Sequence, residues 1–210
     1  MKSTESSAEH ELDKINEEVS RCKKCPLWRT RRRTVPGEGS NHPRVMLIGE
    51  GPGEKEDLAG RPFVGRAGRL LDELLTSIGL NRESAYVTNI VKCRATTVRS
   101  TEGPVFEPRD RRPTDEEIVS CTPYLNRQIS VLRPRIISTL GDTATRFILE
   151  KYGLRKSNIS KVHGRVYSVD RLKIIPMYHP AAALYTAGLR DTLEKDFKKL
   201  AGLLEQKTLI

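Results

Sequence analysis

The sequence predicts an α/β fold in which a parallel β-sheet carries helices on both faces. Short apolar runs of strand type alternate along the chain with longer segments whose apolar residues recur at helical spacing. Strands that alternate with helices pair in parallel, because each helix carries the chain back across the sheet. At 210 residues the chain can bury one sizeable core, so we expect a single domain over residues 1–210.

The two ends of the chain lie outside this alternation. Residues 1–21 read as a polar segment that leads into a short amphipathic helix over 9–20. Residues 21–43 are rich in Cys, Arg, Pro and Gly and predict an irregular but ordered loop. Residues 205–210 predict a flexible, frayed tail.

Apolar periodicity and helix-end signals place the remaining elements. Thr114 and Glu117 have the spacing of a capping box and predict the start of a helix, which Pro123 should break or kink. The long polar stretch 94–112 predicts a loop. The predicted strands are 44–49, 85–91, 134–141 and 171–178, and the predicted helices that follow them are 67–79, 113–132, 142–153 and 190–204.

Polar residues follow each predicted strand. In open parallel sheets, ligands bind in the crevice beyond the carboxyl ends of the strands. We therefore expect one crevice lined by the groups that follow the four strands in turn, namely Glu50 with a glycine-rich loop, Asn89, Gly141 with Asp142, and Tyr178 with His179.

The chain is strongly basic, with 37 Lys plus Arg against 27 Asp plus Glu and a net charge of +10. Such a balance suits a polyanionic partner, nucleic acid first and an anionic membrane surface second, although a solvated basic surface without a partner stays an alternative. The chain has no apolar run long enough to span a membrane and no apolar stretch near its N-terminus. We expect an intracellular, cytoplasmic protein without a membrane.

The stretch "GEGPGEKEDLAGRPFVGRAG" over 49–68 combines glycines with carboxylates. A dinucleotide loop would run straight into a helix, whereas "EKEDLAG" follows here in place of one, and the lysine of a P-loop is absent. The acidic side chains would also repel a phosphate. Phe63, between a proline and a glycine, is either a core plug or an exposed stacking platform, and burial statistics favour the plug.

The four cysteines form a second candidate site. Cys22 and Cys25 are a C-x-x-C pair that precedes the first strand, unlike a thioredoxin-type redox pair, and Cys93 and Cys121 are the only others. In a reducing compartment, four thiolates with none to spare indicate a metal centre, either zinc or an iron–sulfur cluster. Four reduced core thiols are the alternative.

Three motifs together resemble a known family. "GEGPGEKEDLAGRPFVGRAG", "VTNIVKCR" and "HPAAAL", with the four cysteines in order, resemble the family 4 uracil-DNA glycosylases, and the resemblance runs from Cys22 to the last helix. It implies a three-layer αβα sandwich with a central four-stranded parallel sheet. It also implies a [4Fe–4S] cluster on Cys22, Cys25, Cys93 and Cys121. The stretch between Cys93 and Cys121 is longer than in the family pattern, which leaves the role of its loop open.

The resemblance implies a DNA-repair enzyme that acts on deaminated cytosine. It would flip uracil out of DNA and hydrolyse its N-glycosidic bond, leaving an abasic site. Phe63 would stack on the uracil ring, and Asn89 would pair with N3–H and O4. His179 would donate a hydrogen bond to O2 as negative charge develops there. A helix cap or a core histidine is the alternative role for His179.

The glycine loop would bring backbone and carboxylates to the base. Backbone amides near Glu50 and Gly51 can meet O2, and Gly53 belongs to the same flexible stretch. Glu56 would lie near uracil C5 and exclude the methyl group of thymine. The best-known relatives place a water-activating aspartate where this chain has Gly51, so Glu50, Glu56, Asn89 or a backbone group must orient the water here.

The basic residues beside the cysteines predict contacts with DNA. Leu184 is a candidate wedge for the space left by the flipped base, or else a core leucine. The charge run that we expect to meet phosphates comprises Arg29, Arg31, Arg32 and Arg33.

Other functions stay open at this point. A glycosylase of broader specificity, acting on hypoxanthine or mismatched bases, would share most of these residues. A non-catalytic iron–sulfur or zinc nucleic-acid-binding module would have no use for the polar groups at the strand ends. We expect a nucleoid-associated monomer, with a frayed tail in which Gln206 and Leu209 are candidate anchors for a sliding clamp.

Overall fold

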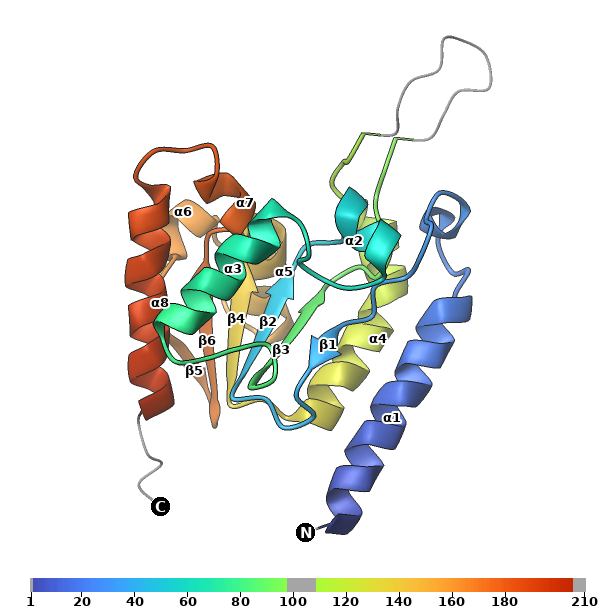
Figure 1. Ribbon diagram of the computed structural model, residues 1–210, viewed down its shortest axis with the longest axis horizontal. Helices are drawn as coiled ribbons and strands as arrows, with labels where there is room; N and C mark the ends of the chain where they lie inside the picture. Colours follow the sequence, from blue (N-terminus) through green and yellow to red (C-terminus); the bar gives the residue numbers. More distant parts are fainter. Residues whose placement is uncertain (1, 98–108, 206–210) are drawn as a thin grey trace.

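The computed structural model describes residues 2–97 and 109–205, which form a six-stranded sheet with helices on both faces (Figure 1). The strand order is β1-β3-β2-β4-β6-β5. The strands are β1 (Glu38–Gly39), β2 (Val45–Gly49), β3 (Ala85–Asn89), β4 (Ile136–Leu140), β5 (Tyr167–Val169) and β6 (Leu172–Met177).

The central strands β3, β2, β4 and β6 are all parallel, which confirms the predicted α/β fold. The two outer strands, β1 and β5, run antiparallel to their neighbours. The sequence did not predict either of them, because elements of two and three residues are too short to carry a periodicity.

The sheet separates two hydrophobic cores. Along β2, Val45 and Leu47 face one core while Met46 and Ile48 face the other, as the alternation of side chains in a strand requires. We call them the α1/α4/α5 core and the α3/α8 core after the helices that cover them. The α1/α4/α5 core contains α1 (Lys2–Arg21), α4 (Asp115–Leu132) and α5 (Asp142–Lys151), and the α3/α8 core contains α3 (Arg66–Ser77), α7 (Pro180–Ala183) and α8 (Leu189–Glu205).

Helix α1 is longer than predicted, and of the two effects expected at Pro123 the break does not occur. Helix α1 begins at Lys2, because polar helix-forming residues extend it beyond the apolar pattern on which the prediction rested. Pro123 does not break α4, which runs unbroken to Leu132 with its capping box at Thr114 in place. The carbonyl that loses its donor to the proline is that of Val119, which lies on the solvent-facing side of the helix with 70% of the residue exposed.

A short helix, α2 (Glu54–Ala59), occupies the stretch predicted to lack one. Its first turn holds Glu54, Glu56 and Asp57, whose negative charge is favourable at a helix N-terminus, and Gly60 ends it in the left-handed conformation. The remaining helices are a 3₁₀ helix, η1 (Pro26–Arg29), and α6 (Ile159–Val162). Within the described residues, no helix has the length and apolar character needed to cross a bilayer.

Candidate active site

The carboxyl ends of the central strands open into a cleft of about 400 Å³. The crevice expected from the strand order therefore exists, and Gly141 and Asp142 at the start of α5 line it as well. Tyr178 does not line the cleft. Its ring packs on that of His163, with the ring centroids 4.8 Å apart. The candidate residues that the structure brings together along the cleft wall are Glu50, Gly51, Gly53, Glu56, Phe63, Asn89 and His179.

Phe63 belongs to the core and to the cleft at once. Its side chain is only 5% exposed and packs in the α3/α8 core, while one part of it lines the cleft. Its ring stacks on the imidazole of His179, with centroids 5.5 Å apart and planes 25° from parallel. The plug and the platform are thus not exclusive alternatives, because a ring held in the core can still present an edge or face to a ligand.

Asn89 ends β3 with a buried acceptor that has no partner. The residue is 1% exposed, and its Oδ1 atom receives no hydrogen bond from the described residues. A buried polar atom left unpaired costs about 1–3 kcal/mol, so such an atom in a cleft wall indicates a ligand that donates to it. The backbone carbonyl of Asn89 accepts from Lys92 Nζ at 2.7 Å, which fixes this end of the strand.

His179 caps helix α7 and lines the cleft. Its Nδ1 accepts from the backbone N–H of Ala181 at 3.1 Å. Burial lowers the pKa of His179 to about 4, and the nearby charge of Glu56 only partly opposes this. A neutral imidazole whose Nδ1 accepts must carry its proton on Nε2. The helix cap, one of the two roles predicted as alternatives, is confirmed, and this tautomer leaves the Nε2 proton for the other role, which stays a prediction.

Glu50 and Glu56, the two acidic residues of the glycine-rich stretch that line the cleft, are held differently. Glu56 Oε1 accepts from the backbone amides of Val64 and Gly65 at 2.8 and 2.9 Å, which fixes the segment that follows Phe63. Glu50 accepts from the hydroxyl of Thr143 on α5. Glu56 is therefore the more heavily engaged of the two.

The segment that precedes α4 supplies a wall of the cleft that the sequence did not predict. Asp110, Arg111 and Arg112 line it. Asp110 pairs with Arg94 at 2.6 Å, and Arg111 makes a two-pronged ion pair with Glu117 at 2.7 and 2.8 Å. Nothing in the sequence marked these residues, because a polar stretch rich in Arg and Pro is typical of a solvated loop.

The four cysteines converge as expected. All of them line one small cavity between α1, η1, the end of β3 and α4. Arg31 Nη1 donates to Cys93 Sγ at 3.3 Å, and the backbone N–H of Lys92 donates to Cys121 Sγ at 3.2 Å.

The surroundings of these sulfurs bear on what they can hold. Burial raises the pKa of Cys25 and Cys121, and that of Cys93 to about 11, so these groups are thiols unless a cation draws off their protons. Among the described side chains, no three Cys, His, Asp or Glu residues are drawn together tightly enough to coordinate an ion. Four sulfur donors with N–H groups directed at them nevertheless fit a thiolate-ligated centre in chemistry.

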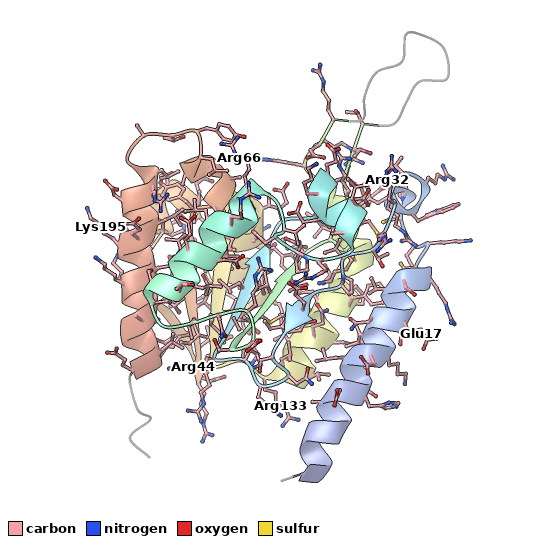
Figure 2. All side chains as sticks on the ribbon, viewed as in Figure 1. Glu17, Arg32, Arg44, Arg66, Arg133 and Lys195 are labelled. Atoms are coloured by element: carbon pink, nitrogen blue, oxygen red, sulfur yellow. The ribbon has the colours of Figure 1, made fainter. Side chains whose placement is uncertain are left out.

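The four arginines beside the cysteines differ in the direction of their side chains. Arg31 turns inward, donating to the carbonyls of Cys22 and Ser20 as well as to Cys93, so its geometry assigns it to the cysteine group and not to phosphate. The side chains of Arg29, Arg32 and Arg33 are exposed. Figure 2 shows Arg32 at the end of the molecule to which the parallel strands point, with Arg44 and Arg133 at the opposite end.

The segment after α7 contains one half-buried and one exposed large side chain. Leu184, the candidate wedge, is half-buried against the α3/α8 core. Its neighbour Tyr185 is 77% exposed, and the guanidinium of Arg66 lies 5.8 Å from the centre of its ring. Gln206 and Leu209, the candidate clamp anchors, lie outside the described residues.

Comparison with known proteins agrees with this geometry. The family model described as "Uracil DNA glycosylase superfamily" matches residues 36–202. The chain is 44% identical over 203 residues to a type-4 uracil-DNA glycosylase of Saccharolobus solfataricus, covering 94% of this chain and 88% of the relative. It is 47% identical to that of Sulfurisphaera tokodaii (91% and 84% covered) and 38% identical to that of Thermotoga maritima (93% and 96% covered).

The lowered pKa of His179 predicts a loss of stability in mild acid. The unfolded chain binds a proton at this histidine near pH 6.5, whereas the folded chain binds it only near pH 4. Between these values the unfolded state holds more protons, so the free energy of unfolding falls as the pH falls from 6.5 to 4, by at most about 3 kcal/mol. Denaturant titrations across this range should show that His179→Gln removes much of the fall. His42→Gln, at an exposed position, is the control and should leave the fall unchanged; equal behaviour of the two variants would contradict the prediction.

Proposed function

The chain belongs to the uracil DNA glycosylase superfamily, and from this premise we propose how its cleft works as a uracil-DNA glycosylase. The enzyme is a DNA-repair hydrolase that removes uracil by cleaving its N-glycosidic bond. The observation that carries the assignment of the cleft is the buried, unpartnered Oδ1 of Asn89 in its wall. Uracil N3–H is the donor that this atom lacks.

Asn89 and Phe63 recognise the base. The carbonyl of Asn89 accepts from N3–H and its NH₂ group donates to O4, which is the complement of uracil and not of cytosine. Phe63 stacks on the ring, and the backbone of Gly51 and Gly53 approaches the base closely because neither residue has a side chain. Glu56 lies beside C5, where it excludes the methyl group of thymine.

His179 stabilises the departing base. As the bond between N1 and the sugar breaks, the electron pair stays with uracil and negative charge grows on O2. A neutral imidazole with its proton on Nε2 donates a hydrogen bond to that oxygen, and the geometry of the α7 cap supports this tautomer. Water adds its oxygen to the sugar carbon and releases a proton, and the abasic sugar and free uracil result.

Glu50 is the better candidate for holding that water. Position 51 is a glycine in this enzyme, so no carboxylate stands there to orient water. Glu56 already accepts two backbone amides, whereas Glu50 accepts a single hydroxyl, that of Thr143. We therefore assign the orientation of water to Glu50.

DNA is the partner of the basic surface. We propose that Arg29, Arg32 and Arg33 contact phosphates, because their side chains are exposed while the backbone of Arg32 and Arg33 is fixed by the buried carboxylate of Asp57. A fixed backbone lowers the entropy lost when side chains are ordered on DNA.

We propose that the four cysteines hold a [4Fe–4S] cluster, as the type-4 relatives and the sulfur donors support. When bound, the cluster supplies an inorganic cross-link through its iron–sulfur bonds. Arg31 and the backbone of Lys92 then donate hydrogen bonds to ligand sulfurs and offset their negative charge. The cluster would in this way cross-link three parts of the chain, namely residues 22–25, the segment after β3 and helix α4.

Base choice is tested by Asn89→Asp. Aspartate has no fixed donor for O4, so uracil excision should fall by about a hundredfold or more, since leaving two groups unpaired costs about 1–3 kcal/mol each. Weak excision of cytosine could appear, because a carboxylate accepts from N4 and, when protonated, donates to N3. The measurement is strand cleavage at abasic sites in matched oligonucleotides that contain uracil or cytosine. Undiminished uracil excision by the variant would remove Asn89 from base reading, and no excision by the wild type would remove the activity itself.

The cofactor is tested by metal content. Protein purified without oxygen should be brown and contain about four irons per chain, as a cubane cluster on four thiolates requires. Cys121→Ser should lose the colour and most of the iron. A colourless wild type with one zinc per chain would contradict the cluster and leave the thiolate site as a zinc centre.

The wedge is tested by comparing Leu184→Ala with Tyr185→Ala. Because Tyr185 is the exposed side chain of the pair, we expect it to fill the space left in the stack. Its loss should slow single-turnover excision from duplex DNA about tenfold while excision from single strands stays nearly unchanged. Leu184→Ala should instead lower the melting temperature. A duplex-specific loss in Leu184→Ala alone would restore Leu184 as the wedge.

A further inference from the structure

Arg82 binds the backbone carbonyls on both sides of Phe63. The residue lies in the turn between α3 and β3, and its side chain is 22% exposed. Its Nη2 donates to the carbonyl of Phe63 at 2.6 Å, and its Nη1 donates to the carbonyl of Pro62 at 2.9 Å. One planar guanidinium therefore holds two successive carbonyls, outside the group of side chains that lines the cleft.

The backbone that Arg82 holds is strained and crowded. Phe63 has φ of 52°, a left-handed conformation that costs a residue other than glycine about 1–2 kcal/mol. Its carbonyl oxygen packs against α3 so closely that a Cβ atom at Gly68 would lie 1.7 Å from it. A segment in such a conformation needs outside contacts to stay there.

Two carboxylates hold Arg82 in turn. Asp72 on α3 accepts from Nε at 2.6 Å, and Glu38 on β1 accepts from Nη1 at 3.1 Å. The exposed Arg61, which precedes Pro62, also binds Glu38, at 2.7 Å, but among the described residues its guanidinium donates to Glu38 and not to the Pro62 or Phe63 carbonyls. The two carboxylates thus fix the orientation in which the guanidinium donates to the carbonyls. A lysine could not reproduce this geometry, because its ammonium is a point donor.

We propose that Arg82 is a positioning residue, whose bonds to the Pro62 and Phe63 carbonyls keep the Phe63 ring in its stack with His179. This rests on the proposed function, in which Phe63 stacks on uracil and His179 donates to O2. Arg82 does not touch the base. It acts on base excision through Phe63 alone.

A double-mutant cycle tests whether the effect passes through Phe63. Arg82→Gln should lower single-turnover uracil excision about tenfold in the wild type and less than twofold in a Phe63→Ala background. Binding to DNA that carries an abasic-site analogue should be unchanged, because that ligand has no base to stack. Arg61→Gln is the matched control, since it removes the other partner of Glu38, and it should leave excision unchanged. Equal losses in both backgrounds, or loss of abasic-DNA binding, would overturn the proposal.

A second measurement does not depend on activity. The stacked Phe63 ring shifts the His179 ring protons in the ¹H NMR spectrum, and Arg82→Gln should move those signals toward their values in Phe63→Ala. Arg82→Lys, which keeps the charge and loses the fork, should give a smaller change in the same direction and replaces Arg82→Gln if that variant does not fold. Unmoved His179 signals would overturn the proposal. If the wild type excised no uracil, the proposed function would fail while this measurement still decided the role of Arg82.

Discussion

No side chain fits at the carboxyl end of β2, and the arrangement of the cleft depends on this constraint. A Cβ atom at Gly49 would lie 2.3 Å from Asn89 Oδ1 and 2.8 Å from Cζ of Phe63. Gly49 also pairs in register with Asn89 on the neighbouring strand. Asn89 and Phe63, which we propose to read the base and to stack on it, therefore approach each other across a backbone without a side chain. In this proposal the glycines of the loop provide space for a base and not a cradle for phosphate.

Helix α2 joins the two halves of the functional surface. Its residue Glu56 holds the amides that follow Phe63, while the next residue, Asp57, is 2% exposed and accepts from the amides of Arg32 and Arg33. Adjacent side chains of a six-residue helix thus fix the Phe63 segment and the basic loop relative to each other. Two of the acidic residues that argued against phosphate binding, Glu56 and Asp57, therefore act as anchors for backbone N–H groups.

The fold and most of the cleft could be predicted from the sequence. The buried strands predicted the parallel sheet, and strand order alone brought Glu50, Asn89 and His179 to one edge. Local periodicity could not predict α2, because a helix of six residues is too short to show a repeating pattern, although the charges of its first turn favour a helix. It could not predict the place of Arg111 and Arg112 in the cleft wall either, because that place depends on how their segment folds back beside α2 and the strand ends, and no periodic pattern marks it. Arg82 is likewise visible only in three dimensions.

The two sides of the sheet support different parts of the cleft. Cys93 and Cys121 lie in the α1/α4/α5 core and Phe63 in the α3/α8 core. Lys92 connects the cysteines to the cleft, because its amide donates to Cys121 Sγ and its Nζ donates to the carbonyl of Asn89. The cysteine group is therefore joined directly to the strand end that carries Asn89, whereas Phe63 lies across the sheet from it. A change in the position of Cys121 would thus act on Asn89 through a single buried side chain, without passing through the stacked rings of Phe63 and His179.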